Sequence, residues 1–309
     1  MKKLLVLLLC VVVLSSCSNQ KKYEKTVFSM DTQITMTAYG NNAEKSLHLA
    51  EEEIKRIDEK FKNSNLEKTM EENDEETKKL LHTAIEIREK TDGAFDVRIA
   101  PIMRAWGFYS EEFTEKSYKI PTDKELCDAI LKMQEGMEID LGGIAKGYCA
   151  DRVTEILKDN GVTSAVLSLG GNVSVIGKKP DGNLWNVGIK NPFGEGIYAK
   201  ISLEDTSAVT SGDYIRYFEK DGKRYHHIID TKTGYPADSG LSSVTVISKN
   251  STVADALSTA LFVMGKDRAI EYWKNDKTFQ MVLIEKSGKI YCTDGIQIET
   301  DYEKEMIEG

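Results

Sequence analysis

The chain has 309 residues, of which 40% are hydrophobic, so it is long enough for one large domain or two merged ones with a proper core. Its formal net charge of -9 argues against nucleic acid as a partner, because a phosphate-binding surface needs an excess of lysine and arginine. Beyond the N-terminal region the cysteines are Cys127, Cys149 and Cys292, whose wide spacing argues against a disulfide framework and against a cysteine metal site.

The N-terminal region has the pattern of a secretory signal that ends in a cysteine. Two lysines precede an apolar run over residues 4–14, which is too short to cross a bilayer, since that takes about 20 residues. The Leu-Ser-Ser-Cys sequence ending at Cys17 is similar to a bacterial lipobox, which implies removal of residues 1–16, acylation of Cys17 (for example with palmitate) and a polar tether over 17–25. We therefore expect a lipid-anchored protein on the extracytoplasmic side of a bacterial cell membrane. The alternative is an ordinary secretory peptide with a chance cysteine.

The first half of the remaining chain predicts one strand and several helices. Residues 26–39 alternate and are rich in threonine and valine, which is typical of a strand. Helices are expected over 42–62 with Asn42 as the N-cap, over 74–91 with Asp74 as the N-cap, over 122–133 with a Thr122–Glu125 capping box, and over 144–157.

Strands dominate from residue 164 onward. They are expected at 164–169, 173–177, 185–189, 197–203, 214–219, 224–229, 241–248, 280–285 and 289–292, with helices over 252–264 and 266–274. Because helices mix with antiparallel hairpins and no regular strand–helix alternation is present, the predicted class is α+β, with mixed or antiparallel sheets packed against helices.

The stretch Asp-Leu-Gly-Gly-Ile-Ala-Lys-Gly at 140–147 is the strongest functional signal in the chain. Two adjacent glycines predict a tight turn, and the helix that follows presents free N–H groups and the positive end of its dipole, which suit a phosphate. Lys146 adds a positive charge one turn into the helix, and Asp140 can accept a hydrogen bond from a ligand. The alternative is a plain strand-to-helix turn with an incidental lysine.

Asp255 and Thr259 lie four residues apart on the helix expected over 252–264, which puts both side chains on one helix face. A carboxylate and a hydroxyl are hard oxygen ligands that suit Mg²⁺. Apolar neighbours make a carboxylate costly there unless a cation or hydrogen bonds compensate its charge. The alternative is an exposed aspartate and a threonine bonded to its own helix.

Three further segments combine strand ends with polar turns. The segment 226–234 brings two histidines and Asp230 close together, which suits ligand orientation or proton transfer, although Asp230 also suits the capping of its own turn. Residues 169–172, Leu-Gly-Gly-Asn, and 210–213, Thr-Ser-Gly-Asp, each permit close approach of a ligand, and each is also compatible with a plain turn. Together these loops predict one extended pocket.

Seven segments, in this order along the chain, resemble the ApbE family of FAD:protein FMN transferases. They are Met30, the Gly-Ala-Phe-Asp sequence at 93–96, and the segments 140–147, 169–172, 210–213, 227–234 and 254–259. The resemblance implies a single compact, T-fold-like unit over residues 26–309. It also implies Mg²⁺-dependent transfer of FMN from FAD onto a Thr or Ser hydroxyl of a partner flavoprotein, with release of AMP.

The resemblance further implies roles for individual residues. The metal ligands would be Asp255, Thr259 and the backbone carbonyl of Gly143, and His227 would be the histidine of the reactive site. Contacts to FAD would come from Met30, Ala94, Phe95, Asp96, Asp140, Lys146 and Ile228. Phe61 lies near the position of a residue that covers the flavin ring, but it suits the core side of its helix equally well.

Two alternatives to the transferase stay open at this point. With water in place of the acceptor hydroxyl, the same residues would make the chain an FAD pyrophosphatase that gives FMN and AMP. The other alternative is a lipoprotein that binds FAD without any catalysis.

Overall fold

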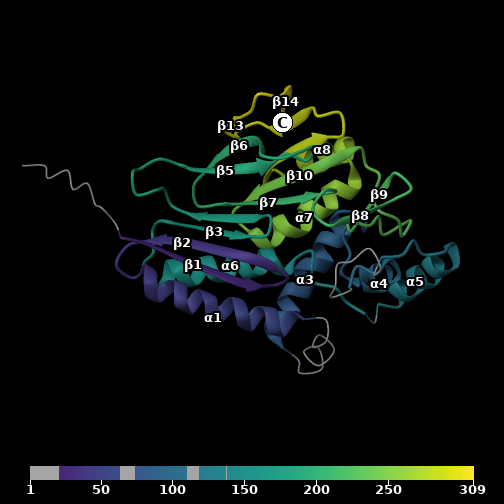
Figure 1. The fold of residues 1–309 in the computed structure, drawn as a ribbon, viewed down its shortest axis with the longest axis horizontal. Coiled ribbons are helices and arrows are strands. Elements are labelled where there is room, and N and C mark those ends of the chain that lie inside the picture. The colour runs from purple at the N-terminus through teal and green to yellow at the C-terminus, as the bar shows by residue number, and fades with distance from the viewer. Residues whose placement is uncertain (1–20, 63–73, 110–117, 137) are drawn as a thin grey trace, which may run out of the picture.

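The structure, a computed structural model, describes residues 21–62, 74–109, 118–136 and 138–309 (Figure 1). The predicted signal sequence and Cys17 lie outside these residues. Over the described ranges, no helix has the length and apolar character needed to cross a membrane.

A nine-stranded sheet forms the centre of the fold, in the order β1-β2-β3-β4-β7-β10-β11-β12-β14. Neighbouring strands are antiparallel except β12 and β14, which are parallel. The bounds are β1 Lys22–Ser29, β2 Thr32–Tyr39, β3 Ala165–Leu169, β4 Asn172–Ile176, β7 Ser207–Gly212, β10 Leu241–Ser248, β11 Gln280–Glu285, β12 Ile290–Thr293 and β14 Lys304–Ile307. A smaller sheet has three strands in the order β13 Ile298–Glu299, β6 Ile197–Leu203 and β5 Trp185–Lys190. A third sheet is the hairpin of β8 Tyr217–Lys220 and β9 Lys223–His226.

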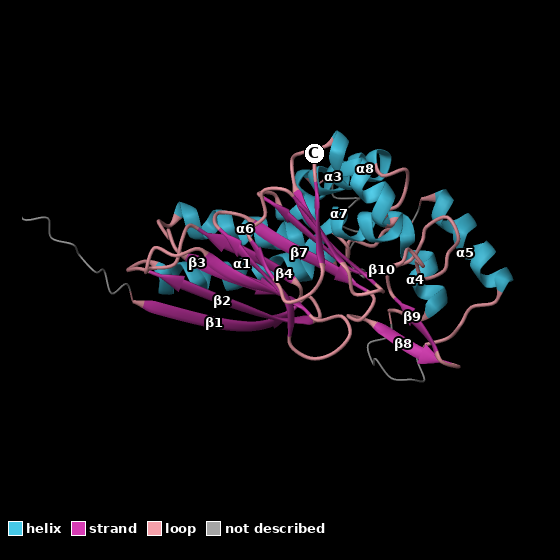
Figure 2. Cartoon of the chain, turned by 90° about the horizontal axis from the view of Figure 1, so that it is seen from above, coloured by secondary structure: helices cyan, strands magenta, loops and turns pink. Residues whose placement is uncertain are grey.

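Helices cover one face of the large sheet, as the view from above shows (Figure 2). The three that contact it or one another most are α1 Ala43–Phe61, α6 Ala145–Asp159 and α7 Ser251–Met264. The others are α3 Glu75–Lys90, the 3-10 helix η1 Val97–Ile99, α4 Ala100–Trp106, α5 Asp123–Glu135 and α8 Lys266–Asn275. The main apolar core lies between these helices and the sheet.

Two further apolar clusters complete the packing. One lies between the opposite face of the large sheet and the β5–β6 strands, around Trp185 and Ile201. The other joins α4, α5 and the β8–β9 hairpin around Trp106 and Phe108. Because β10 has neighbours on both faces, seven of its eight residues are buried, which is the pattern of a strand at the centre of a covered sheet.

The mixed architecture confirms the predicted α+β class, and two of the three predicted helix caps are present. Asp74 accepts a hydrogen bond from the Thr77 N–H at 2.7 Å, and the Thr122–Glu125 capping box is complete. The prediction that Asn42 caps α1 is wrong, because its side-chain amide donates instead to the Asn160 carbonyl at 3.0 Å.

The single strand predicted over residues 26–39 is in fact two strands joined by a tight turn. Met30 and Asp31 form this turn with φ values of 52° and 57°, the conformation of a two-residue type I′ hairpin. Asparagine and glycine usually occupy such turns, so this pair gave no signal for a break. β1 begins at Lys22, inside the stretch 17–25 that we expected to be a tether.

Several short elements differ from the sequence-based expectation. Residues 210–212 belong to strand β7 and not to a turn, and β9 ends at His226, before Ile228. The elements η1, α4, β13 and β14 were not predicted. Each spans seven residues or fewer, which is too short for a periodic pattern to stand out.

Candidate active site

The segments singled out from the sequence meet at one end of the large sheet. A Cβ added to Gly170, in the β3–β4 turn, would lie 2.4 Å from Thr32 Oγ1, next to the β1–β2 turn. Thr210 in β7 donates its N–H to the Gly171 carbonyl at 3.1 Å. Both glycines have positive φ, so the 169–172 segment is also a hairpin turn in its own right.

Asp255 lies on α7 and faces the first turn of α6. The residue is only 5% exposed, and its Oδ2 accepts the Gly147 N–H at 2.8 Å. A Cβ on Gly147 would lie 2.2 Å from the Ser251 carbonyl oxygen, so the two helices can approach this closely only with glycine here. The alternative of an exposed aspartate is therefore wrong.

The negative charge of Asp255 is compensated only in part. The N-terminal end of α6 stabilises an anion, but no lysine, arginine or histidine among the described residues forms an ion pair with this carboxylate. Asp151, nearby, caps α7 through the Ser251 and Thr252 N–H groups, each at 2.8 Å. Burial, together with the charge of Asp255, raises the pKa of Asp151 despite these hydrogen bonds. A bound cation would relieve this concentration of negative charge.

Hydroxyl groups lie close to this acid. Thr259 Oγ1 is 3.3 Å from Ser211 Oγ on β7, and Ser211 Oγ is 2.7 Å from Ser258 Oγ. Such oxygens, together with a carboxylate, form the donor set that suits Mg²⁺, which usually takes one or two carboxylates and completes its shell with water and substrate oxygens. The described part of the chain contains no group of three or more His, Cys, Asp or Glu side chains that could hold a metal.

The glycine turn immediately precedes α6, whose Gly147 N–H binds Asp255. The edge of the Phe95 ring covers Gly143, where a Cβ would lie 3.0 Å from Phe95 Cε2. Lys146 Nζ donates to the Gly142 carbonyl at 2.9 Å. In the first turn of α6, the Ala145 N–H donates to the Leu141 carbonyl and the Gly147 N–H to Asp255, each at 2.8 Å. The binding of an anion by this turn stays a prediction.

Asp140 is held from two sides. Its Oδ1 accepts the Gly142 N–H at 2.7 Å, and its Oδ2 accepts the Tyr109 hydroxyl at 2.7 Å. Burial and the charge of Asp140 raise the pKa of Tyr109 far above its usual value, so the hydroxyl remains a donor. The orientation of this carboxylate is therefore fixed before any ligand binds.

His227 is held by the backbone of Arg216. Its Nδ1 lies 3.1 Å from the Arg216 carbonyl, an acceptor, so Nδ1 carries the proton and Nε2 is the basic atom of the ring. Burial lowers the pKa of His227 to about 3, with further lowering by the charges of Arg216 and Lys146 against the opposing effect of the carbonyl. The ring is neutral at physiological pH.

The adjacent histidine points into the core. His226 Nε2 donates to the Ala237 carbonyl at 3.1 Å, and its ring meets Phe262 of α7 edge-on. Burial lowers the pKa of His226 to about 4. Of the two histidines, His227 is the one that neighbours Lys146 and Arg216.

Side chains bonded to backbone carbonyls fasten the remaining loops of the site. Thr231 Oγ1 donates to the Gly93 carbonyl at 2.5 Å, and Trp106 Nε1 donates to the Gly234 carbonyl at 2.7 Å. Asp230 accepts the Lys232 N–H at 2.9 Å, which confirms that it caps its own turn. The loops at 91–96 and 228–234 thus lie against each other.

Several residues expected to contact FAD have buried side chains. Ala94, Phe95 and Ile228 belong to the main core, while Met30 is half-buried in its turn. Asp96 caps η1 and receives Arg88 Nε at 2.8 Å. Burial alone would raise the pKa of Asp96, but hydrogen bonds from Arg98 and Arg88 lower it overall.

Phe61 also belongs to the main core. Its residue is 7% exposed, and its ring meets Tyr148 of α6 at a centroid distance of 5.8 Å. The structure thus shows Phe61 as a core residue, and its covering of the flavin ring stays a prediction. Tyr109 and Arg216 are neighbours of the site that were given no role from sequence, because they lie in irregular segments after α4 and before β8 with no motif of their own.

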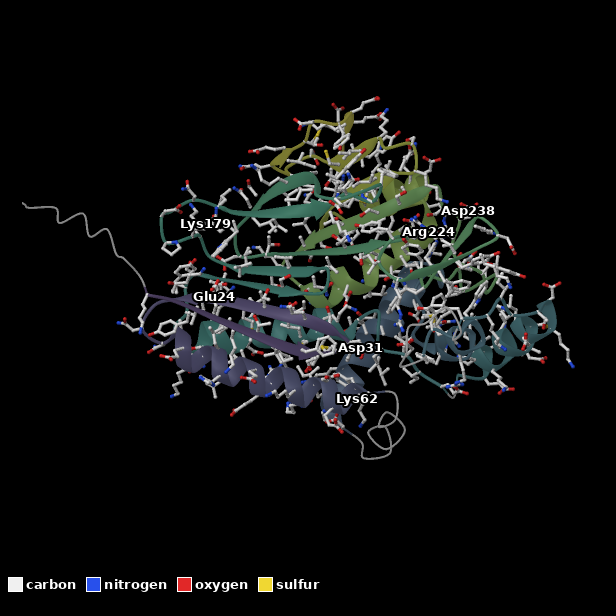
Figure 3. The ribbon with its side chains drawn as sticks, in the orientation of Figure 1. Glu24, Asp31, Lys62, Lys179, Arg224 and Asp238 are labelled. Carbon is white, nitrogen blue, oxygen red and sulfur yellow. The ribbon has the colours of Figure 1, made fainter. Side chains whose placement is uncertain are left out.

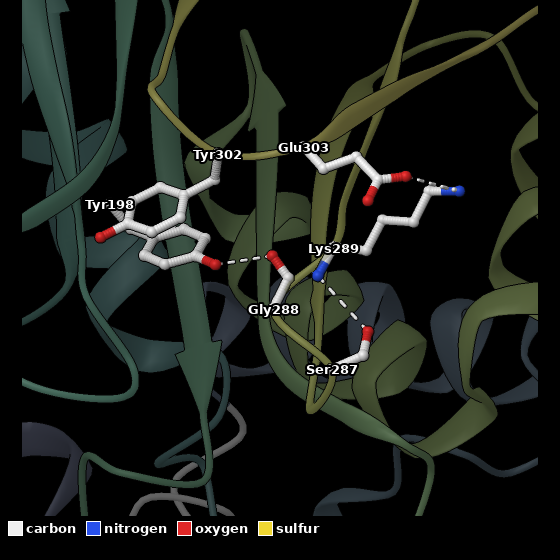
Figure 4. A pocket seen from close by; sticks show the side chains of 6 residues that line it. All are labelled: Tyr198, Ser287, Gly288, Lys289, Tyr302 and Glu303. Atoms are coloured by element: carbon white, nitrogen blue, oxygen red, sulfur yellow. Dashed lines mark hydrogen bonds and ion pairs between the residues drawn. The ribbon is translucent and has the colours of Figure 1, made fainter.

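A pocket of about 410 Å³ lies elsewhere on the molecule, between β6 and the C-terminal strands (Figure 4). It is lined by Tyr198, Ser287, Gly288, Lys289, Tyr302 and Glu303. Tyr198 and Tyr302 stack on each other at 3.7 Å, and Tyr198 donates its hydroxyl to the Gly288 carbonyl at 2.6 Å. None of the residues predicted to act in the site lines this pocket.

Comparison with known proteins places these features in one family. The model of the ApbE family matches residues 30–283. The chain is 36% identical over 214 residues to the FAD:protein FMN transferase of Klebsiella pneumoniae, which covers 64% of this chain and 66% of that protein. It is 33% identical over 245 residues to the FAD:protein FMN transferase of Treponema pallidum, covering 70% of this chain and 67% of that protein.

Solved structures agree with these matches. The ApbE protein of Thermotoga maritima superimposes with a TM-score of 0.79 at 34% identity, over 87% of this chain and 96% of that one. The flavin transferase ApbE of Vibrio cholerae superimposes with a TM-score of 0.75 at 24% identity, over 91% and 97% of the two chains. The similarity to the Thermotoga maritima protein extends to sequence and fold, whereas the similarity to the Vibrio cholerae protein concerns the fold alone.

Proposed function

Because the chain belongs to the ApbE family, we propose that it is an FAD:protein FMN transferase. The reaction moves FMN from FAD onto a Thr or Ser hydroxyl of a partner flavoprotein, through a phosphoester bond, and releases AMP. The similar proteins of Klebsiella pneumoniae and Treponema pallidum carry this name, although the matched region spans only about two thirds of their length.

One observation supports the proposal most strongly: a buried acid, to which no cation among the described residues is paired, faces the first turn of the helix that follows the glycine pair. Asp255 accepts the Gly147 N–H of α6, and the Gly142–Gly143 turn lies just before the same helix. A pyrophosphate carries negative charge and so needs a cation between itself and a carboxylate. Asp255, Thr259 and the Gly143 carbonyl are suited to hold Mg²⁺, which would neutralise the pyrophosphate charge when bound.

The residues of the chain then have separate tasks. The Gly143 and Lys146 N–H groups, with the Lys146 ammonium group, bind phosphate oxygens, while the Gly142 and Gly147 N–H groups hold Asp140 and Asp255 in place. His227 Nε2 accepts the proton of the acceptor hydroxyl, whose oxygen forms a bond to the FMN-side phosphorus. The bond from that phosphorus to the bridging oxygen breaks, and AMP leaves with the bridging oxygen and its electron pair.

The membrane attachment belongs to the same proposal. Cleavage before Cys17 and acylation of its sulfur would hold the domain at the extracytoplasmic face of a bacterial membrane, where two or more acyl chains are enough for stable anchoring. A Cys17→Ala variant is then expected in the soluble fraction, while the wild-type protein sediments with membranes.

A labelling assay tests the transferase. The domain from residue 18 onward is incubated with FAD, Mg²⁺ and an acceptor protein that carries an Asp-x-x-Ser/Thr-Gly-Ala-Thr segment, and flavin fluorescence is followed in a denaturing gel. We expect a fluorescent acceptor band that requires Mg²⁺, and AMP in equal amount. FMN and AMP without any labelled acceptor would indicate a pyrophosphatase, and intact FAD after prolonged incubation would indicate a binding protein.

A further inference from the structure

We propose that the lipid-anchored protein is oriented with one end of its large sheet against the membrane. The catalytic site then lies about 25 Å further from the lipid. This inference rests on the lipid anchor proposed above. We call the lipid-facing surface the anchor end and define it by Lys21 and residues 40–42, 160–163 and 177–179. The surface would fit the headgroups of an anionic bilayer, and the opposite end would meet the acceptor protein.

The first observation is the shortness of the link between Cys17 and the folded domain. β1 begins at Lys22, so only residues 18–21 separate the modified cysteine from the sheet. A link of this length reaches at most about 18 Å when fully extended. The anchor end therefore stays near the headgroups, whatever conformation the link adopts.

The point where the chain enters the sheet is firmly held. The Gly40 N–H donates to the Lys21 carbonyl at 3.1 Å, and the Tyr39 N–H donates to the Ser164 carbonyl at 3.0 Å. The Asn42 amide donates to the Asn160 carbonyl at 3.0 Å. Lys21 is thus tied to the sheet, and the link gains no length by peeling β1 away.

β1 and α1 then run side by side from the anchor end to the catalytic site. Lys25 pairs with Glu51, and further along Ser29 Oγ donates to Asp58 Oδ2 at 2.6 Å. A strand of eight residues spans about 26 Å and a helix of 19 residues about 28 Å. The Met30–Asp31 turn of the site follows directly, so strand and helix together form a rigid spacer.

Figure 3 shows which residues lie at the anchor end and which lie near the site. Glu24 and Lys179 lie toward the end of the sheet at which β1 begins, whereas Asp31 and Lys62 lie toward the site. Lys62 follows the last residue of α1, and Lys179 follows the end of β4.

Charge favours an upright domain over one that lies flat. The whole sequence has a net charge of -9, and loss of the predicted signal would remove two further lysines, so an anionic bilayer repels the body of the domain. Lys21 and Lys22, exposed beside the link, are attracted to it, and Lys22 is also paired with Glu24 at 2.6 Å. The acceptor hydroxyl must then belong to a domain of the acceptor protein that projects from the membrane. A hydroxyl on a segment at the lipid surface would not reach the site.

Fluorescence quenching in vesicles tests this orientation. The full-length lipidated chain, in a Cys127→Ser background because Cys149 and Cys292 are buried, carries a dye at either Lys179→Cys or Lys62→Cys. The vesicles contain phosphatidylcholine, phosphatidylglycerol and a lipid with a nitroxide on its headgroup. We expect loss of most of the fluorescence at position 179 and of little at position 62. A 20-residue Gly/Ser insertion before Lys22, which adds about 25 Å of reach, should restore the fluorescence at position 179.

Equal quenching at the two positions, or stronger quenching at position 62, would overturn the upright orientation. A chain that stays in the supernatant overturns the orientation together with the lipid anchor. FMN transfer to a soluble acceptor, measured on the same samples, reports on the transferase alone, so a failure of that proposal is recognised separately.

Discussion

The two sides of the candidate site are built in different ways. The metal side, defined by Gly147, Ser211, Asp255 and Thr259, belongs to long elements of the main core and joins α6, α7 and β7. The histidine side, comprising Tyr109, Asp140, Arg216 and His227, lies in turns and short segments that are held by hydrogen bonds, several of them from side chains to backbone carbonyls.

Because the two sides are built differently, substitutions on them can distinguish effects on packing from effects on the reaction. On the metal side, a substitution that adds atoms between α6 and α7 disturbs the packing of these helices, whereas an isosteric one affects the reaction alone. A substitution on the histidine side should affect the reaction and leave the core intact. Each prediction below tests that distinction, beginning with the largest expected effect.

Replacement Asp255→Asn should lower the rate of FMN transfer by about 10³-fold, because it removes the only acid on the metal side. The amide oxygen still accepts the Gly147 N–H, and a buried charge is lost, so the free energy of unfolding without metal should not fall. Transfer rates and thermal melts in the presence and absence of Mg²⁺ measure both effects. A variant that keeps its rate and still gains stability from Mg²⁺ would place the metal elsewhere.

Replacement His227→Gln should slow transfer by about 100-fold while FAD binding and melting temperature stay close to wild type. The matched control is His226→Gln, which should keep the rate but lose stability, because its ring packs on Phe262. If the two variants exchange these effects, the assignment of the base is wrong.

The pH dependence of the wild-type enzyme sharpens this point. Since the pKa of His227 is lowered to about 3, the ring remains unprotonated as the pH falls from 8 to about 5, and its capacity as a base should persist. We expect kcat/KM to stay flat over this range. A loss centred near pH 6.5 would reveal a histidine with an ordinary pKa.

Replacement Gly147→Ala should lower the free energy of unfolding by about 2 kcal/mol, since the new Cβ would lie 2.2 Å from the Ser251 carbonyl oxygen and 2.7 Å from Asp255 Cβ. Chemical denaturation measures the change. Gly194→Ala is the control, because its Cβ would meet nothing closer than Asn191 Nδ2 at 3.7 Å. Equal stability of the two variants would show that α6 and α7 adjust freely, contrary to a rigid metal side.

The same contrast explains what the sequence was able to predict. Asp255 and Thr259 share a helix, so their spacing alone brings them to one face. Tyr109 reaches Asp140 from 31 residues away, and Arg216 reaches the Phe108 carbonyl from 108 residues away, distances over which no periodic pattern carries information. The Met30–Asp31 turn was missed for another reason, because tertiary contacts hold two unfavourable residues at positive φ.

Replacement Tyr109→Phe should have the smallest effect, a rise of about fivefold in the KM for FAD with kcat nearly unchanged. It removes one of two hydrogen bonds that orient Asp140, while the Gly142 N–H still holds the other oxygen. Tyr235→Phe is the matched control, because it deletes a similar bond to Asp123 on the surface. A fall in kcat with an unchanged KM would mean that Asp140 acts on the reacting atoms, in which case the histidine side would contain a second catalytic group and not only a binding one.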